Sequence, residues 1–426
     1  MPPRSPARHP STAPTPATPL SVHALPVLAA LLAAVVACEP DRALTGTALG
    51  DSTGRGALRA DLTSETAIGA PLPFLSFEQR LAFDRGSGVF LRVFTPATGL
   101  GPLFNGSSCA ECHEAPVVGG AGDEVETHAT AFHGLGVCDE LTAQGGPVVQ
   151  DSVTPALRVA RGIDKEPAPA GATAVGRRTS NSILGLGLLD AVPDWEILAL
   201  ADPNDRNYDG ISGRVNRAAD GRIGRFGRKA QVSSLGAFVA TAFVEEMGIT
   251  SPAEPAERSI GGEPIPAGVD ATPDPELPQD DLTAAQTFVQ LLAPPRPEPL
   301  TFGAVAGSLV FAKLGCSSCH VPALLTGYNR VSALSFKAVY AYTDLLLHDM
   351  GPELADICLA QASPSEFRTA PLMGLRFREA FLHDGRAKTI EESILLHGGE
   401  GGRSRDRFAG LAPLERWALL KYLSGL

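Results

Sequence analysis

The chain has 426 residues, enough for two or three domains, and its composition is that of a globular protein. The formal net charge is −12 and no cluster of Lys and Arg marks a nucleic-acid-binding face, so we expect no nucleic-acid partner. Glycine (45) and proline (36) are both abundant, which predicts long irregular connections.

Residues 1–37 have the pattern of a signal peptide. Arg4 and Arg8 supply positive charge, and residues 25–37 form an apolar run that is short for a membrane span. The run ends in Val-Val-Ala-Cys, which resembles the bacterial lipobox and predicts Cys38 as the lipidated first mature residue. The alternative is ordinary signal-peptidase cleavage nearby. In both cases we expect an exported protein in the bacterial periplasm, anchored to a membrane in the lipidated form.

A flexible tether is expected over residues 38–70, which are rich in Gly, Ser, Thr and Ala and lack apolar periodicity. Order is expected from Pro71, and the spacing of apolar residues over 89–94 fits a helix.

The chain contains two Cys-x-x-Cys-His motifs, at Cys109, Cys112 and His113 and at Cys316, Cys319 and His320. Two thiols at this spacing can each add to one vinyl group of the same porphyrin, and the following histidine then binds the iron. Zinc and a redox dithiol are the alternatives, but a zinc site would need a second close Cys/His pair, which neither motif has. We therefore predict two covalently bound haem c groups.

Two cysteines, Cys138 and Cys358, remain after the four in the motifs and the one at the lipobox. In an oxidising compartment they could form a disulfide. They could equally be two separate buried thiols, and the sequence leaves both readings open.

Between the motifs, His128 is a candidate distal ligand of the first haem, although such a histidine is more often at the surface or bound to other groups. Short strands are expected at 148–149 and 157–159. Arg177 and Arg178 precede a Gly-spaced apolar run, and arginines commonly bind haem propionates. The alternative is a packed Gly-rich segment.

Asp205, Asn207 and Asp209, followed by Gly210, match the first half of a calcium-binding loop. The twelfth position is Asn216 rather than Glu, so an EF-hand is not expected. A simpler calcium site and a solvated Asx turn remain as alternatives.

Helices are expected over 193–200, 232–247, 302–314 and 413–426, with one more that has Asp281 as its N-cap. The proline-rich stretch around this last helix predicts a boundary near 295–300. We thus expect an N-terminal haem domain with insertions (71–295) and a C-terminal cytochrome c-like haem domain (300–426).

Further possible ligands of the second haem are His348, Met350, His383 and His397. Haem iron takes a sixth ligand from His or Met, or leaves that position open for peroxide or oxygen. Each candidate alone is more often structural, and His-Asp pairs in particular can be hydrogen-bonded supporting units.

The sequence resembles the bacterial di-haem oxidoreductases, some of which are called thiol oxidoreductases, and more distantly the di-haem cytochrome c peroxidases. The matching segments are 101–113, 185–190, Asp-Gly-Ile-Ser-Gly at 209–213, Gly-Arg-Phe-Gly at 224–227, 344–351, 369–376 and 382–397. The resemblance implies a mainly α fold of two cytochrome c-like haem domains with long irregular connections and a few short strands.

In the peroxidase relatives, the sixth ligand of the C-terminal haem lies fourteen residues after a motif histidine that matches His383, which leads to His397. The resemblance therefore implies that His320 and His397 both bind the second haem, while the distal ligand of the first haem does not carry over. Relatives often carry a tryptophan where this chain has Arg228, so any electron path through that tryptophan would be missing.

These observations favour an exported di-haem c-type oxidoreductase with a cytochrome or quinol-linked redox partner. One haem would relay electrons, and the haem at His113 would be a peroxidase-like or substrate-oxidising site. The alternative is a non-enzymatic di-haem electron-transfer protein.

Overall fold

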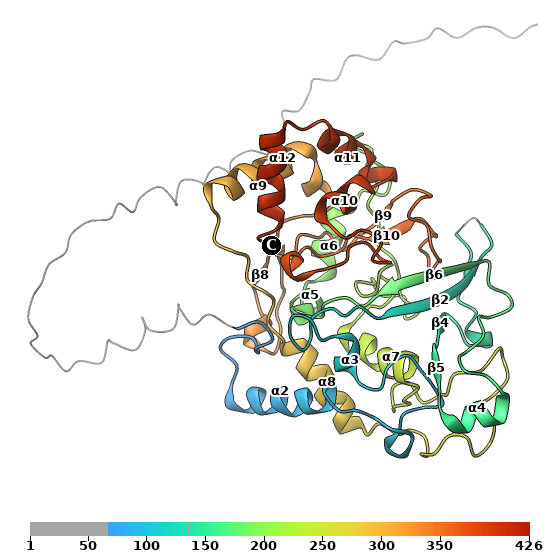
Figure 1. Ribbon diagram of the computed structural model, residues 1–426. Helices are drawn as coiled ribbons and strands as arrows, with labels where there is room; N and C mark the ends of the chain where they lie inside the picture. Colours follow the sequence, from blue (N-terminus) through green and yellow to red (C-terminus); the bar gives the residue numbers. More distant parts are fainter. Residues whose placement is uncertain (1–66, 135) are drawn as a thin grey trace, which may run out of the picture. The chain divides into compact units, whose positions relative to one another are not determined.

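Two pairs of packed helices are prominent in the part of the chain that the computed structural model describes, residues 67–134 and 136–426 (Figure 1). In one pair α2 (Phe77–Phe90) packs against α8 (Gln279–Leu291). In the other, α9 (Phe302–Leu314) packs against α12 (Pro413–Leu423). The predicted signal peptide (1–37), the lipidation site at Cys38 and nearly all of the predicted tether (38–70) lie outside the described residues.

Local sequence explains where these helices begin and why they pack closely. Ser76 caps α2 in a capping box with Gln79. The ring of Phe288 from α8 lies 4.9 Å from the rings of both Phe83 and Phe90, between centroids. Burial of each such ring contributes roughly 1.5–3 kcal/mol. In the second pair, a Cβ at Gly307 would lie 2.0 Å from a backbone oxygen of α12, so only glycine permits this approach.

The other helices are short. They are α3 (Cys109–Cys112), α4 (Pro155–Arg161), α5 (Leu186–Asp190), α6 (Asp194–Leu200), α7 (Leu235–Met247), α10 (Ile390–Leu395) and α11 (Gly402–Ala409). Short 3₁₀ turns lie at η2 (Pro96–Thr98), η3 (Thr142–Gln144), η4 (Cys316–Ser318), η5 (Ser332–Leu334), η6 (Leu375–Phe377) and η7 (Gly399–Gly401). The expected helices over 193–200, 232–247, 302–314 and 413–426 are present within a few residues. The helix expected to be capped by Asp281 instead begins at Gln279, after Pro278, and Asp281 lies in its acidic first turn.

One four-stranded sheet contains the only described strands longer than three residues, β2 (Val125–Phe132) and β6 (Ala174–Thr179), which pair antiparallel. Strand β2 also pairs with β3 (Cys138–Asp139) and β4 (Val148–Val149). The remaining strands form two-stranded pairs: β1 (Leu103–Phe104) with β5 (Ser152–Val153), β7 (Leu324–Leu325) with β8 (Ala338–Val339), and β9 (Leu347–Asp349) with β10 (Glu366–Arg368).

The expectation of strands between the motifs is confirmed at one place and wrong at another. Val148–Val149 is strand β4, but residues 157–159 belong to helix α4. Thr154 caps that helix by accepting a hydrogen bond from Leu157, and Pro155 occupies its first turn, where a missing N–H costs nothing. These capping residues outweigh the β propensity of Val159.

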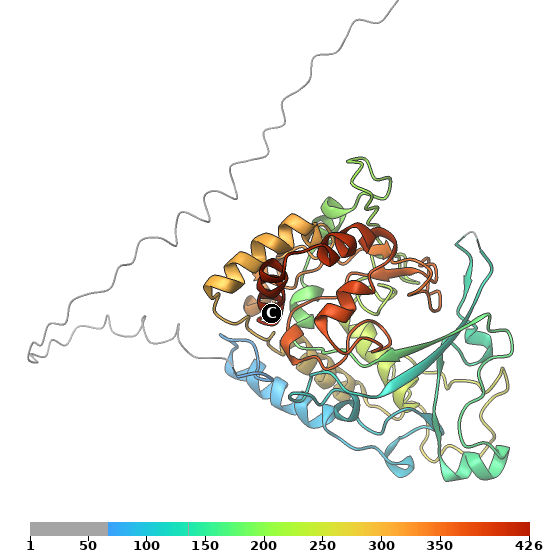
Figure 2. The ribbon, with the colours of Figure 1, turned by 45° about the horizontal axis from the view of Figure 1, so that its top comes forward.

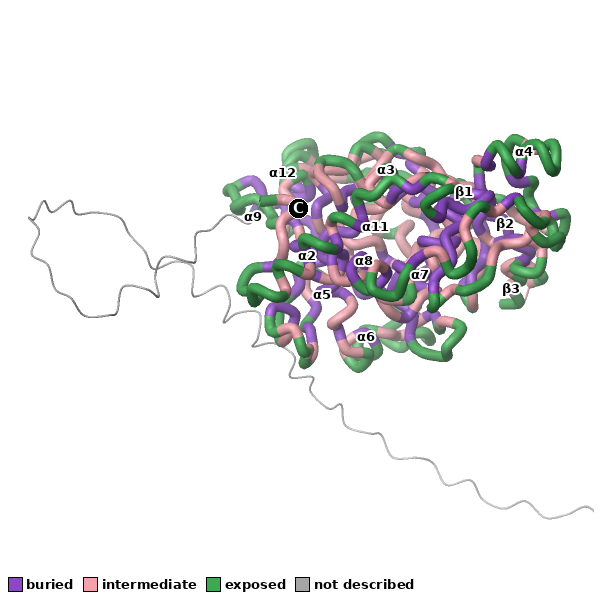
Figure 3. Tube along the Cα trace, turned by 90° about the horizontal axis from the view of Figure 1, so that it is seen from below, coloured by how far each residue is buried: buried purple, intermediate pink, exposed green. Residues whose placement is uncertain are grey.

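Buried residues gather in the interior of the described chain, and exposed residues lie along outer loops and on α4 (Figure 3). The largest apolar cluster includes residues from Leu72 to Leu346 and therefore crosses the predicted boundary at 295–300. A second cluster joins α9, α12 and Phe408 of α11. The described fold is about a third helical with few short strands, and the division into two haem domains stays a prediction.

The orange chain around β9 and β10 lies near strand β6 (Figures 1 and 2). A disulfide and a buried ion pair connect residues 356–358 to the four-stranded sheet. Cys138 of β3 is bonded to Cys358, so the first of the two readings of these cysteines applies. Nearby, Asp356 pairs with Arg178 of β6 at 2.9 Å and with the fully buried Lys229 at 3.0 Å. Within the described residues, no helix combines the length and apolar character that crossing a membrane requires.

Candidate haem site

Both Cys-x-x-Cys-His motifs open onto the same interior cavity, whose volume is about 410 Å³. Its lining includes His113 from the first motif and Cys316, Cys319 and His320 from the second. The apolar part of the lining comes from segments as distant as Ile183 and Leu423. The structure therefore brings together two motifs that are 207 residues apart, counted from His113 to His320 (320 − 113).

The first motif forms a single helical turn that fixes His113. Ser108 caps α3 by accepting a hydrogen bond from the Glu111 backbone at 3.2 Å, so both cysteines lie on one turn. Nδ1 of His113 lies 3.2 Å from the carbonyl oxygen of Gly120. A Cβ at Gly120 would lie 1.9 Å from the carbonyl oxygen of Ala115, so the loop reaches the histidine only because glycine stands here.

Ser180, which follows β6, supports the same histidine. Its hydroxyl donates to the carbonyl of Cys112 at 2.5 Å and lies 3.3 Å from Nδ1 of His113. Burial lowers the pKa of His113, so the ring is neutral at neutral pH. With Nδ1 directed at backbone oxygen, Nε2 is the ring nitrogen available to an iron.

The second motif is held in a similar way by different elements. Helix α9 ends at Gly315, whose φ of +87° turns the chain into η4 and Cys316. Nδ1 of His320 donates to the carbonyl of Tyr342 at 3.0 Å. The hydroxyl of Tyr342 in turn accepts a hydrogen bond from Tyr422 of α12 at 2.9 Å, so the last helix of the chain positions the anchor of His320.

His397 also lines the cavity, immediately after α10. Its Nδ1 donates to the carbonyl of Ser393 at 2.7 Å, and burial lowers its pKa, so Nε2 carries a free lone pair. Burial is the main cause that lowers the pKa of His320 to about 4, and both rings line the same cavity. Each is a neutral imidazole anchored through Nδ1, the state in which a histidine would hold a haem iron, and ligation of one iron by both stays a prediction.

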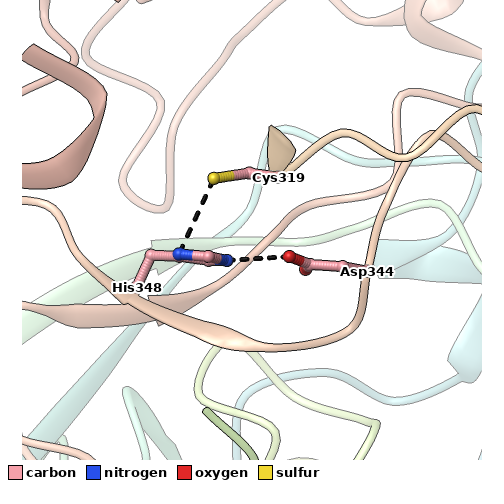
Figure 4. Close-up of side chains that lie close together, drawn as sticks. All are labelled: Cys319, Asp344 and His348. Carbon is pink, nitrogen blue, oxygen red and sulfur yellow. Dashed lines mark hydrogen bonds and ion pairs between the residues drawn. The ribbon is translucent and has the colours of Figure 1, made fainter. Parts of the chain in front are cut away.

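His348 has a different environment from the other candidates (Figure 4). Its Nε2 lies 2.8 Å from Asp344, its Nδ1 lies 2.7 Å from Glu400, and Cys319 Sγ is 3.6 Å from Nδ1. Burial alone would lower the pKa of His348, but these hydrogen bonds raise it to about 12, so the ring is an imidazolium with both nitrogens engaged. This arrangement suits a supporting residue beside the second haem rather than an iron ligand.

The two other candidates near the second motif both line the cavity. Met350 lies beside the loop that follows His397: its Cε is 3.4 Å from the Cβ position of Gly401, so its sulfur is a possible donor on the side of His397. The ring of His383 stacks on Phe367 at 4.6 Å between centroids, and burial lowers its pKa to about 4.

A group of acids lines the cavity together with His113: Glu126 of β2 and Glu246 of α7. Nε2 of His128 donates to Glu126 at 3.1 Å, while Nδ1 of His128 is buried with no partner among the described residues. Burial and the charge of Glu126 hold the pKa of Glu246 well above its usual range. Burial also acts to raise the pKa of Glu126, but the hydrogen bond and charge of His128 hold it low. The two environments therefore shift the pKa values in opposite directions, favouring the protonated form of Glu246 and the ionised form of Glu126.

The segment expected to bind calcium or form an Asx turn contains several Asx turns. The backbone N–H of Gly210 donates to Asp205 at 3.1 Å, that of Asp209 to Asn207 at 3.0 Å, and that of Ile211 to Asp209 at 2.9 Å. These bonds match the second of the two readings, and a calcium ion at this place stays a prediction.

The described residues fit covalently attached haem. One thiol pair, Cys316 and Cys319, three imidazoles anchored through Nδ1 and an apolar lining surround one cavity, and Nε of Arg378 is buried beside it without a partner among the described residues. Several cavity residues had no signal in the sequence, namely Glu126, Glu246, Glu400, Arg368 and Arg378. His128 is one of the expected candidates, but strand β2, which carries both His128 and Glu126, is not among the expected elements.

Comparison with known proteins gives the class. The family model described as "Di-haem oxidoreductase, putative peroxidase" matches residues 171–426, which include the second motif. The chain belongs to this di-haem oxidoreductase family. The first motif, at 109–113, precedes the matched residues. A search of curated proteins gave no match.

Solved structures give distant similarities. Hydrazine synthase of Kuenenia stuttgartiensis is 13% identical, with a TM-score of 0.36 over 91% of this chain and 99% of that one. The di-haem peroxidase BthA of Burkholderia thailandensis is 15% identical, with a TM-score of 0.39 over 84% and 87%. A MauG-like protein associated with microbial copper homeostasis is 14% identical, with a TM-score of 0.37 over 87% and 95%. The family assignment rests on the family model and not on these low scores.

Proposed function

We propose that this protein is an exported di-haem c-type oxidoreductase that reduces peroxide with electrons from a redox partner in the bacterial cell envelope. The observation that carries the proposal is the single cavity that both Cys-x-x-Cys-His motifs line, with His113 and His320 anchored through Nδ1. Cys109, Cys112, Cys316 and Cys319 would form the thioether bonds. The lipobox pattern at Cys38 supports a membrane-anchored form.

The two sites would have different roles. At the second, His320 and His397 can fill both axial positions, which suits a relay that carries electrons without binding substrate. At the first, His113 faces a part of the cavity lined by Glu126 and Glu246. A protonated acid beside an ionised one suits proton transfer to a bound substrate.

Reduction of hydrogen peroxide to two water molecules consumes two electrons and two protons. The haem would supply the redox chemistry at the oxygen atoms, and the electrons would come from a partner cytochrome or a quinol-linked donor. In this scheme Glu246 would donate one proton to the departing oxygen of peroxide, the second proton would come from water, and Glu126 holds His128 through its hydrogen bond. The buried surroundings of Glu246 keep its proton in place until peroxide binds.

The test uses the full chain produced with its signal peptide, so that export and haem attachment can proceed. The expected result is two covalent haems per chain, in the membrane fraction, and peroxide-dependent oxidation of a reduced small cytochrome c. Two haems without peroxide turnover, together with spectra that cyanide does not change, would instead support the electron-transfer alternative. Substitution of Cys316 and Cys319 by Ser should leave one haem per chain.

A further inference from the structure

Three arginine side chains converge on the cavity between the segments that support the two motifs: Arg228, Arg368 and Arg378. Arg228 donates to the carbonyl of Thr179, the residue before Ser180, at 2.8 Å. Arg378 donates to the carbonyl of Pro371 at 3.2 Å. The next residue, Leu372, packs against the apolar cluster of α9 and α12 that supports the second motif. The group therefore adjoins both candidate haem sites.

None of these three guanidinium groups has a carboxylate partner among the described residues. Their acceptors are a hydroxyl and backbone carbonyls, including that of Gly227, which accepts from Arg368 at 2.9 Å. Nε of Arg378 is buried with no acceptor. Burial, and then the positive charges of the neighbouring arginines, lower the pKa of Arg228 to about 9. Like charges that repel one another in a partly enclosed cavity are costly unless an anion lies between them.

Two neighbouring cations, unlike these three arginines, have a carboxylate partner. Arg178 lines the same cavity and Lys229 directly follows Arg228, but both are neutralised by Asp356, at 2.9 and 3.0 Å. Arg177, the other half of the basic pair noted in the sequence, is exposed and away from the cavity lining. The described chain thus supplies a carboxylate for Arg178 and Lys229 and none for the three arginines Arg228, Arg368 and Arg378.

We propose that Arg228, Arg368 and Arg378 bind propionate carboxylates of the two haems. The inference rests on the proposed function, because it takes porphyrins as the occupants of the cavity. Each haem brings two carboxylates on the edge opposite its thioether bonds, and guanidinium groups bind carboxylates through paired hydrogen bonds. A cluster that adjoins both sites can receive carboxylates from both porphyrins.

The experiment compares R228Q, R378Q and R368Q with wild type as purified two-haem protein. The readouts are the propionate bending bands in resonance Raman spectra and the midpoint potentials of the two haems. We expect the propionate bands to shift in each variant. We also expect at least one midpoint potential to fall, because a positive charge beside a haem favours the reduced state.

R376Q is the matched control. Arg376 lies two residues from Arg378 and also binds backbone carbonyls, those of Gly425 and Leu426, but it stacks on Phe377 and does not line the cavity. Its bands and potentials should equal those of wild type. If a glutamine variant is not recovered with haem, the charge-retaining variants R228K and R378K take its place. Their midpoint potentials should stay near those of wild type.

The outcomes separate the two proposals. Wild-type protein without covalent haem would overturn the proposed function and this inference with it. Two haems per chain with unchanged propionate bands and potentials in all glutamine variants would overturn only the inference. If the arginines bind a free anion instead, titration of formate into wild type should change the haem spectrum, and the same titration of R228Q should not. That result would likewise overturn the propionate assignment.

Discussion

Glu400 joins His348 to Ser212: one carboxylate oxygen lies 2.7 Å from Nδ1 of the imidazole, and the other accepts from the serine hydroxyl at 2.7 Å. Ser212 belongs to the Asp-Gly-Ile-Ser-Gly segment, and His348 lies beside Cys319 of the second motif. This carboxylate therefore links the loop at 209–213 to the supports of the second candidate haem.

The charged state of His348 predicts a pH dependence of stability. Its pKa is raised from 6.5 to about 12 in the folded chain, so its contribution to stability is complete below pH 6.5 and declines as the pH rises towards 12. We expect the urea midpoint of wild type to fall more between about pH 6 and about pH 9 than that of H348Q. Parallel pH profiles of the two proteins would contradict a raised pKa.

Loss of His397 should change the spin state of one haem. We expect H397A to convert the second haem from low spin to high spin, seen in absorption and electron paramagnetic resonance spectra, because an axial nitrogen is removed. M350L is the control and should remain low spin, although Met350 lines the same cavity. The reverse result, high spin in M350L alone, would assign the position to methionine.

Glu246 is predicted to act as the proton donor at the first site. E246Q should lower peroxide turnover by roughly 10²–10⁴-fold while keeping two haems, because an amide cannot supply the proton. Wild-type turnover should decline as the pH rises through the raised pKa of Glu246. E166Q is a matched control: burial raises the pKa of Glu166 to about 7, but this residue does not line the cavity. Equal losses in both variants would point to a general effect on the fold.

Asp356 should be important for stability because it neutralises two buried cations. D356N leaves Arg178 and Lys229 without their carboxylate and is expected to cost about 3–5 kcal/mol of unfolding free energy. Adding K229M should recover part of that loss, because the methionine removes one uncompensated charge and fits beside Phe367. Urea unfolding measures both effects, and additive losses in the double variant would argue against charge burial as the cause.

The disulfide between Cys138 and Cys358 closes a loop of 220 residues. We expect the C138S/C358S variant to lose about 2–5 kcal/mol of unfolding free energy, because its unfolded chain is less constrained. A reducing agent should destabilise wild type by a similar amount and leave the double variant unchanged. Equal sensitivity of both proteins to reduction would show that another group responds.

The sequence predicted what is encoded locally. Helix α9 begins and ends as expected, since Thr301 and Gly315 cap it in the chain itself. The motif histidines were also found, because Cys-x-x-Cys-His carries its chemistry within five residues. The prediction of His397 as a ligand rests on the resemblance to related sequences, fourteen residues after His383. Its Nδ1 is bonded to the carbonyl of Ser393, which leaves Nε2 free and is compatible with that prediction.

Groups assembled from distant segments could not be predicted in this way. Glu246 depends on its proximity to Glu126, and Asp356 depends on cations from two other segments. Strand β2 was not expected because it lacks an apolar–polar alternation: residues 128–131 are buried on both faces of the strand. In the same region a strand was expected at 157–159, but Thr154 and Pro155 initiate helix α4 there.

The shared cavity also bears on how the protein matures. Its lining comes from segments between His113 and Leu423, so it is enclosed only when nearly the whole described chain has folded. The four motif cysteines are only partly exposed in the finished fold, and burial raises the pKa of Cys109 to about 12. A thiol in that state reacts poorly, so we expect both porphyrins to be attached to an open chain after export, with folding completed around them.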